Sequence, residues 1–153
     1  MATTFNLQYS HTIGFMSLMG DRGFANPVDM AIGQDGLLYV LSRGGSDSND
    51  YSISKRITVC TLNGKYIEDL SSGGRNDGNL VWPSSIALDS DDNLYVADEA
   101  LHRISVFTKS GRFIRKWGTY GSGPGQFDRP AAITIDSDSN LLVVDGLNNR
   151  IQR

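Results

Sequence analysis

Two aspartate-rich segments and one glycine-rich segment are the first places where this sequence could hold a ligand. Residues 89–93 (DSDDN) and 136–140 (DSDSN) begin like a calcium-binding loop. A loop of the EF-hand type requires glycine at its sixth position and glutamate at its twelfth. Both segments have leucine at the sixth position and alanine or leucine at the twelfth, so aspartate-rich hairpin turns explain them better. Residues 118–125 (GTYGSGPG) lack the terminal Gly-Lys-Ser/Thr of a phosphate loop, no helix is expected after them, and they are expected to connect two repeats.

Aspartate and arginine recur five residues apart, in the pairs Asp98 with Arg103 and Asp145 with Arg150. A single active site would not repeat with the fold, so we interpret these pairs as structural contacts in equivalent places. Ser42 stands where the preceding repeat would carry the aspartate. Arg56, the arginine of that repeat, is therefore expected to have a different partner.

The histidines and the cysteine offer little for catalysis. His11 and His102 are the only histidines, and no Ser/His/Asp or Cys/His arrangement follows from the spacing. Cys60 lies in an alternating strand pattern and is expected to be a small buried hydrophobic residue. The sequence therefore predicts no catalytic residue, no metal ligand and no cofactor.

The charge and hydropathy of the chain argue against two classes of partner. A net charge of −3 over 153 residues disfavours nucleic acid, which needs a clustered excess of lysine and arginine. No apolar run approaches the roughly 18 residues of a membrane span, and the first residues do not resemble a signal peptide. One cysteine cannot form an intrachain disulfide. We therefore expect a cytoplasmic protein without a membrane partner.

A repeat organises the whole chain. Arg56, Arg103 and Arg150 are each separated by 47 residues, and so are Pro83 and Pro130. Pro27 and Pro83 are 56 residues apart, and the nine extra residues fit at 44–52 (GGSDSNDYS). One period with one localised insertion indicates repeated copies of the same structural unit.

Each repeat predicts four short strands. Apolar residues alternate with a period of two, which is typical of strands, and glycine- and aspartate-rich turns separate the alternating runs. In the second repeat the strands are expected near residues 84–88, 93–97, 103–108 and 113–118. No segment predicts a helix. Four antiparallel strands in roughly 40–50 residues describe the blade of a β-propeller.

The second repeat resembles an NHL repeat. The resemblance lies in residues 82–89 (WPSSIALD), 93–98 (NLYVAD), 102–107 (HRISVF) and 111–118 (GRFIRKWG), and residues 123–130 (GPGQFDRP) resemble the linker to the next repeat. It implies an all-β fold, an NHL-type β-propeller, with about three four-stranded blades that form the N-terminal half of a six-bladed disc.

The expected organisation is one partial propeller over residues 1–153. Residues 9–15 form an outer strand without its three inner strands, residues 27–71 the first blade with the insertion at 44–52, residues 83–118 the second blade, and residues 130–153 a truncated third blade. In NHL-like propellers the N-terminal outer strand completes the last blade. An arc of three blades leaves open edges, so the chain is expected to aggregate, or to pair so that two arcs close a ring.

Two classes of function fit this fold. The first is a non-enzymatic scaffold that binds a protein or a small polar ligand through one face, and the alternative is a lyase or lactonase-like hydrolase with a site in the central channel. A cluster of His, Glu or Asp on the inner strands would favour the enzyme, but these strands offer only Asp29, Ser84, Ser85, Ala131 and Thr134 near their starts. The insertion marks the expected binding face, whose candidate residues are Arg43, Asp47, Asn49, Asp50, Tyr51, Asp77, Trp82, Glu99, Tyr120, Arg129 and Asn148.

Overall fold

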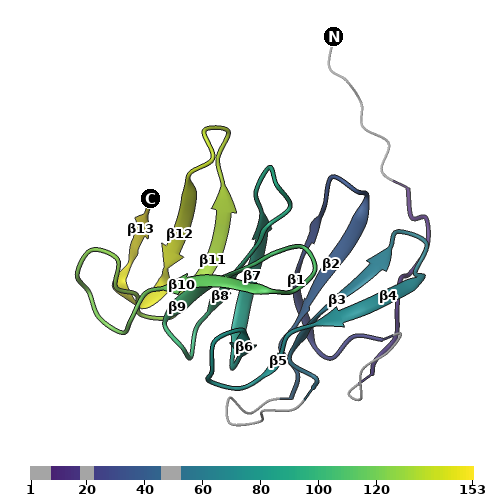
Figure 1. The fold of residues 1–153 in the computed structure, drawn as a ribbon, viewed down its shortest axis with the longest axis horizontal. Coiled ribbons are helices and arrows are strands. Elements are labelled where there is room, and N and C mark those ends of the chain that lie inside the picture. Colours follow the sequence, from purple (N-terminus) through teal and green to yellow (C-terminus); the bar gives the residue numbers. More distant parts are fainter. Residues whose placement is uncertain (1–7, 18–22, 46–52) are drawn as a thin grey trace.

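The computed structural model describes residues 8–17, 23–45 and 53–153, and their regular structure is almost entirely β-strand. Figure 1 shows three twisted sheets side by side in an arc. The first blade contains β1 (Pro27–Ile32), β2 (Leu37–Ser42), β3 (Arg56–Thr61) and β4 (Tyr66–Leu70), and the second contains β7 (Pro83–Leu88), β8 (Leu94–Asp98), β9 (Arg103–Phe107) and β10 (Phe113–Trp117). The third contains β11 (Pro130–Ile135), β12 (Leu141–Asp145) and β13 (Arg150–Gln152), with a 3-10 turn at Gly146–Asn148, and the short strands β5 (Ser72–Gly73) and β6 (Asn79–Leu80) pair within the first connector.

Every blade is an antiparallel meander whose strands follow the chain order. The innermost strands β1, β7 and β11 each begin at a proline and have an irregular register within their first residues. Proline is tolerated at the first position of a strand because the missing amide is not needed for the ladder there. The repeat period of the sequence is therefore the period of the blades.

The alternation along each strand places apolar side chains on both faces of each blade. On β2, Tyr39 and Leu41 face the second blade, whereas Leu38 and Val40 face the opposite direction. The core between the first two blades contains Leu94, Val96 and eight other buried residues, and a second core lies between the second and third blades. Burial on both faces explains why these strands are apolar in consecutive positions.

The strand expected at residues 9–15 is not formed. Residues 8–15 have no regular structure, and Met16 makes one bridge to Phe24. A strand requires a ladder partner, and none of the described residues pairs with this segment. Ile13 instead packs on the outer face of the first blade, and His11 Nε2 lies 2.9 Å from the carbonyl oxygen of Leu62.

The arginines of the 47-residue repeat anchor the segment that leads into each blade. Arg56 donates to the carbonyl oxygens of Ser17 and Gly23. Arg103 donates in the same way to carbonyl groups of the connector that leads into the second blade. Arg150 does so with the connector that leads into the third blade. A guanidinium group has five donors in a fixed plane and suits several carbonyls at once.

Among the described residues, no helix is long and apolar enough to cross a membrane.

Candidate functional site

The loops between the second and third strands of each blade emerge on the same side as the connectors between blades. We call this side the connector face; its described parts are residues 43–45, 53–55, 71–82, 99–102, 118–129 and 146–149. Figure 1 shows it at the lower edge of the arc, opposite the β1–β2, β7–β8 and β11–β12 hairpins. The candidates among the described residues lie on this face: Arg43, Asp77, Trp82, Glu99, Tyr120, Arg129 and Asn148.

Three of these candidates meet where the first and second blades join. The Arg43 guanidinium lies 4.9 Å from the centre of the Trp82 ring, its Nη2 is 3.4 Å from Glu99 Oε1, and its Nε donates to the carbonyl oxygen of Pro83 at 3.0 Å. Lys55 Nζ lies 5.7 Å from the same ring and donates to the Arg43 carbonyl oxygen. We call Arg43, Lys55, Trp82 and Glu99 the seam cluster.

The seam cluster is buried at its bottom and accessible to solvent at its edge. Lys55 is fully buried, whereas the side chains of Arg43 and Glu99 are 20% and 22% exposed and Trp82 is partly buried. Cations over an aromatic face attract its negative quadrupole, most strongly where water is excluded. The arrangement can therefore offer a flat aromatic surface flanked by a cation and a carboxylate. Nothing in the sequence singles out Lys55, because a lysine next to an arginine ordinarily indicates a solvated strand end.

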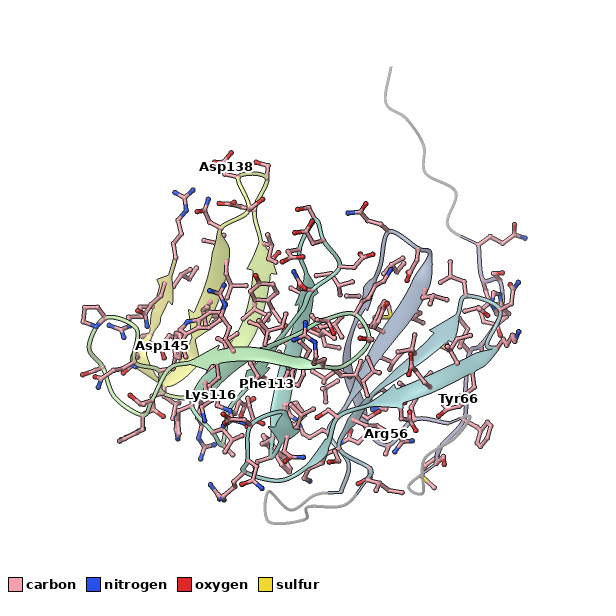
Figure 2. The ribbon with its side chains drawn as sticks, viewed as in Figure 1. Arg56, Tyr66, Phe113, Lys116, Asp138 and Asp145 are labelled. Carbon is pink, nitrogen blue, oxygen red and sulfur yellow. The ribbon has the colours of Figure 1, made fainter. Side chains whose placement is uncertain are left out.

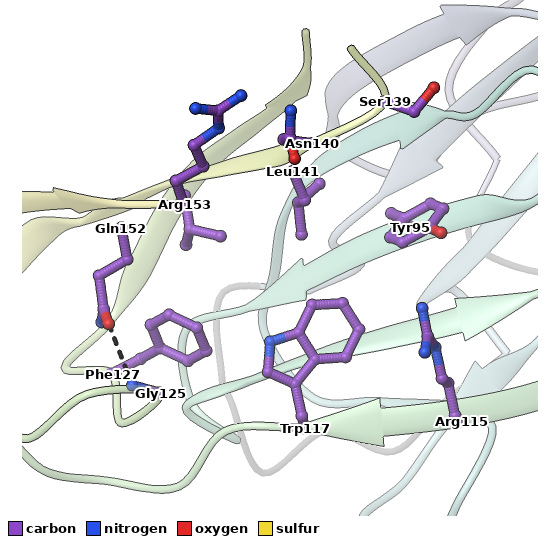
Figure 3. A pocket seen from close by; sticks show the side chains of 11 residues that line it. Tyr95, Arg115, Trp117, Gly125, Phe127, Ser139, Asn140, Leu141, Gln152 and Arg153 are labelled. Carbon is purple, nitrogen blue, oxygen red and sulfur yellow. Dashed lines mark hydrogen bonds between the residues drawn. The ribbon is translucent and has the colours of Figure 1, made fainter.

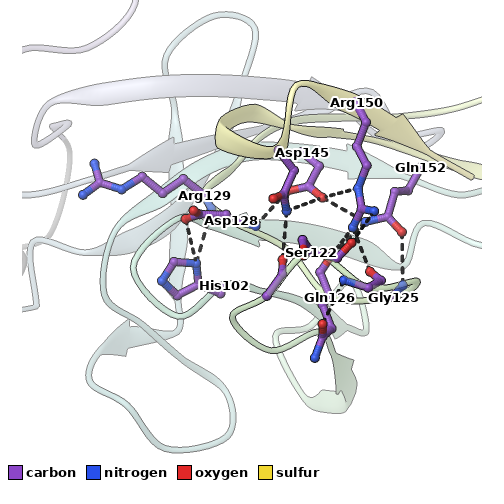
Figure 4. Close-up of polar contacts among 12 residues, drawn as sticks. His102, Ser122, Gly125, Gln126, Asp128, Arg129, Asp145, Arg150 and Gln152 are labelled. Atoms are coloured by element: carbon purple, nitrogen blue, oxygen red, sulfur yellow. Dashed lines mark hydrogen bonds and ion pairs between the residues drawn. The ribbon is translucent and has the colours of Figure 1, made fainter.

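Two more candidates lie at the join of the second and third blades. Tyr120 is 69% exposed and makes an edge-to-face contact with His102, with 4.9 Å between the ring centres. The amide of Arg129 donates to His102 Nδ1, and Asp128 Oδ1 is 3.7 Å from that nitrogen. Figure 4 shows His102 beside Asp128 and Arg129.

The remaining candidates do not join either group. Asp77 pairs with Lys116 of the outer strand β10, and both side chains are substantially exposed. Asn148 is used internally, since its amide donates to Asp145 and to the carbonyl oxygen of Gly121. The candidates in the insertion, Asp47, Asn49, Asp50 and Tyr51, lie outside the described residues. A role for any of these residues in binding stays a prediction.

Of the two expected aspartate–arginine pairs, one forms an ion pair. Arg150 Nε lies 2.8 Å from Asp145 Oδ2, and the fully buried carboxylate also accepts from the amide of Asp128 and from Gln152 (Figure 4). Although burial opposes ionisation, these hydrogen bonds together with Asn148 lower the pKa of Asp145 below its ordinary value. This aspartate holds the last strands and the second connector together.

Asp98 and Arg103 are arranged differently from Asp145 and Arg150. The two residues are cross-strand neighbours, but no hydrogen bond or ion pair joins their described side chains. Asp98 instead accepts from four backbone amides, those of Val81, Trp82, Ala100 and Leu101. Three of these amides bind Oδ1 and one binds Oδ2, whereas the Arg103 guanidinium donates to the connector carbonyls.

In the first blade, different residues join the blade to the segment that leads into it. The Ser42 hydroxyl accepts from the Ala25 amide, where Asp98 and Asp145 accept connector amides in the other blades. Arg56 has the different partner that was expected, since its Nε lies 3.2 Å from Asp69 Oδ1. The aspartates and arginines of the repeat are thus engaged in joining blades to connectors.

The calcium-like segments form hairpin turns. Asp89 Oδ1 accepts from the amides of Asp91 and Asn93, and Asp136 accepts from Asp138 and Asn140 in the same way. The pKa values of both aspartates are lowered by these hydrogen bonds, against the opposing effect of burial. Asp138, at the tip of one turn, lies far from the connector face (Figure 2). Among the described residues, no three His, Cys, Asp or Glu side chains are arranged to hold a metal.

The inner strands use their polar residues to link neighbouring blades. Asp29 Oδ2 accepts from the Ser85 hydroxyl at 2.6 Å and from the Ile86 amide at 2.9 Å. Ser85 in turn accepts from the Ile133 amide, and Ser84 donates to the Pro130 carbonyl oxygen at 2.7 Å. Ala131 and Thr134, the other inner-strand candidates, take part in none of these links. Cys60 is buried, and burial raises the pKa of its thiol.

The architecture agrees with what known proteins show. A family model described as a 6-bladed beta-propeller matches residues 76–152, which is half of the chain. The chain belongs to this 6-bladed beta-propeller family. A comparison with curated proteins found no match.

Several solved structures resemble this propeller. Virginiamycin B lyase from Staphylococcus aureus has 24% sequence identity and a TM-score of 0.58, over 82% of this chain and 36% of that one. A chain of the nidogen/laminin complex has 21% identity and a TM-score of 0.61, over 87% of this chain and 44% of that one. A putative exported protein from Bacteroides fragilis has 15% identity and a TM-score of 0.59, over 86% and 32%. The propeller therefore spans less than half the length of these structures, and the likeness establishes its fold.

Proposed function

We propose that this propeller is a non-enzymatic scaffold that binds a protein partner through its connector face, with the seam cluster and Tyr120 as the principal contacts. The observation that carries the proposal is the partly exposed Trp82 ring with the Arg43 guanidinium 4.9 Å from its centre. Tryptophan, tyrosine and arginine are the residues that most often dominate protein–protein binding energy. The blades themselves we propose to be NHL repeats, on the residue pattern of the second blade.

The residues of the seam cluster do not recur at the same positions of the next blade, whereas the structural residues of the repeat do. The arginines at positions 56, 103 and 150 recur because every blade needs them. By contrast, the positions of Arg43, Lys55 and Trp82 are occupied one blade later by Glu99, His102 and Arg129. Since a blade can be joined to its neighbour with different residues at these positions, the fold alone does not require an aromatic ring with two cations near it. A specific partner supplies a reason for it.

The lyase or lactonase-like alternative has less support in this part of the disc. Virginiamycin B lyase shares the fold, but one fold hosts many unrelated activities. Of the described inner strands β1, β7 and β11, only β1 carries a His, Asp or Glu side chain, which is Asp29. Its carboxylate already links two blades. The connector face therefore remains the better candidate for binding.

Photo-crosslinking tests the proposal. A photoreactive amino acid replaces Arg129, which is exposed on the connector face, or Asp138, which is exposed on the opposite side. In extracts of the source cells, position 129 should give a discrete product with a protein, and position 138 should not. Tyr120→Ala should weaken that product several-fold, because Tyr120 is 69% exposed and its loss leaves the fold intact. Equal products from both positions, or a product indifferent to Tyr120, would contradict the proposal.

A small polar ligand would give a different result. Position 129 would then yield no protein product, and a Tyr120-dependent rise in the unfolding temperature with low-molecular-weight extract would reveal the ligand.

A further inference from the structure

The outer strand β10 of the second blade has a free edge along the rim of the propeller. All four strands of this blade are present, and among the described residues β10 pairs with β9 alone. Its other edge therefore faces away from the sheet. Such an edge carries backbone N–H and C=O groups that can pair with a further strand. The five residues of β10 extend over about 17 Å, which is the length of an ordinary strand.

Positively charged side chains line this edge. The segment 109–116 (KSGRFIRK) contains no acidic residue, although the whole chain has a net charge of −3. Its four exposed cations are Lys109, Arg112, Arg115 and Lys116. Among the described residues, Lys116 is the one of these four with an ion-pair partner, which is Asp77. The edge thus has positive charge that the described part of the chain does not neutralise.

The two cations on β10 itself project to opposite faces of the blade. The Arg115 guanidinium lies 5.6 Å from the centre of the Trp117 ring, and Figure 3 shows both side chains on the same side of the strand. Lys116 lies opposite Ser105 of β9 and pairs with Asp77 of the preceding connector. A strand laid along β10 would alternate its side chains between the same two faces. Acidic side chains on either face of that strand would therefore meet a cation.

The equivalent edge of the first blade has a different charge. Among the described residues, β4 pairs with β3 alone, and both outer strands have an irregular register near their first residues. The residues 47 positions before the four cations are Leu62, Lys65, Glu68 and Asp69. One positive and two negative charges thus stand where the second blade has four positive charges. Two edges of the same architecture differ in charge, so the fold does not require the cations.

Protection of the edge explains the charges only in part. Charged side chains and bulges keep strand edges from pairing with one another. Acidic and basic side chains both give this protection, because like charges repel in either case. Protection therefore accounts for a charged edge and leaves the uniform sign of the β10 edge without a cause. A partner of opposite charge supplies one.

We propose that the β10 edge docks an acidic, extended segment of a protein, which pairs with β10 as an additional strand and places carboxylates beside Lys109, Arg112 and Arg115. In this mode of recognition, main-chain hydrogen bonds supply affinity and side chains supply specificity. The β10 edge is separate from the seam cluster and from Tyr120. The proposal therefore does not depend on binding at the connector face.

Fluorescence anisotropy with labelled peptides tests the docking. The probe is a capped peptide with three repeats of valine-glutamate-glutamate, which has carboxylates on both faces when extended. It should bind, and added salt should weaken the binding. A peptide with lysine in place of glutamate should not bind. A peptide with proline in place of valine keeps the charge but lacks ladder amides, so it should bind roughly tenfold more weakly.

Matched charge reversals locate the site on the protein. Arg112→Glu should raise the dissociation constant of the glutamate peptide by about three- to tenfold. Lys65→Glu makes the same kind of reversal at the equivalent position of the first blade and should leave binding unchanged. Both side chains are exposed, so each variant keeps its fold. Tyr120→Ala should also leave binding unchanged, which separates this site from the connector face.

Hydrogen exchange shows whether a strand is added. The glutamate peptide should slow amide exchange in β10 and leave β4 unchanged. The proposal would be overturned by absent binding, by equal effects of Arg112→Glu and Lys65→Glu, by equal affinity of the valine and proline peptides, or by unchanged exchange in β10. Tighter binding of a single-stranded oligonucleotide than of the glutamate peptide would also overturn it, because the cations would then serve a nucleic acid.

Discussion

Lys116→Asp should stabilise the second blade, because it supplies a carboxylate that two buried polar groups lack. In the first blade, Asp69 accepts from the Thr58 hydroxyl at 2.7 Å and lies 3.2 Å from Arg56 Nε. Thr58 and Asp69 are opposed across β3 and β4. Arg56 and Thr58 are buried and Asp69 is partly exposed, and Asp69 contacts both of them.

The second blade has the same geometry without the carboxylate. Ser105 and Lys116 are opposed across β9 and β10 in place of Thr58 and Asp69. Ser105 Oγ and Arg103 Nε are buried and have no hydrogen-bond partner. Lys116 instead pairs with Asp77 at the surface. Burial lowers the pKa of Arg103, and the negative charges of Asp98 and Asp77 partly oppose this shift. A further carboxylate next to the guanidinium group would favour its charged form.

The expected gain follows from the two unpaired groups. Leaving a buried polar group without a partner costs about 1–3 kcal/mol, and losing the exposed pair of Lys116 with Asp77 costs about 0–1 kcal/mol. With repulsion from Asp77 also opposing the change, we expect Lys116→Asp to raise the free energy of unfolding by about 1–2 kcal/mol. For a chain of this length, that is roughly 2–8 °C in Tm.

Denaturant unfolding of wild type, Lys116→Asp and Lys116→Ala measures the effect. Lys116→Ala removes the pair with Asp77 and adds no carboxylate, so it should be equal to wild type or less stable by up to about 1 kcal/mol. If Lys116→Asp is no more stable than Lys116→Ala, the buried groups are satisfied in another way and the reasoning fails.

Three further predictions follow from the buried polar groups. Asp98→Ser should destabilise the fold by about 1–2 kcal/mol less than Asp98→Ala does, because the Ser42 hydroxyl accepts the equivalent amide in the first blade. Equal losses of unfolding free energy in denaturant titrations would contradict this. Hydrogen bonds lower the pKa of Asp145 in the folded state, so its stabilisation is present above the ordinary pKa of about 3.9 and disappears as the pH falls through the lower folded value. Asp145→Asn should therefore flatten the fall in Tm between neutral pH and about pH 3, and an unchanged slope would refute the assignment. Cys60 is buried with a raised pKa, so a thiol reagent should label it only as fast as the protein unfolds, and rapid labelling without denaturant would show that the core around Ile13 is open.

The sequence alone predicted the blades because their signals are local. A period of two marks each strand, and the 47-residue spacing marks each blade. The turns at residues 89–93 and 136–140 were predictable for the same reason, since an aspartate side chain binds the amides two and four positions later. The blade boundaries expected from proline positions correspond to the first residues of β1, β7 and β11.

Tertiary structure decided which polar groups meet. Asp98 and Asp145 have the same spacing to arginine, yet only Asp145 forms the ion pair. Asp98 accepts from four backbone amides, and Arg103 donates to connector carbonyls. Sequence spacing fixes the backbone positions of such residues but does not show which competing donors surround them. The strand expected at residues 9–15 is absent for a related reason: a strand exists only with a partner, and local sequence contains no information about whether that partner is present.

The seam cluster also depends on the fold. Arg43, Trp82 and Glu99 come from separate segments up to 56 residues apart and meet only because adjacent blades place their connectors side by side. The repeat predicts where each residue lies on its own blade. The distance between residues on different blades is set by how the blades pack, which depends on side-chain volumes throughout the shared core.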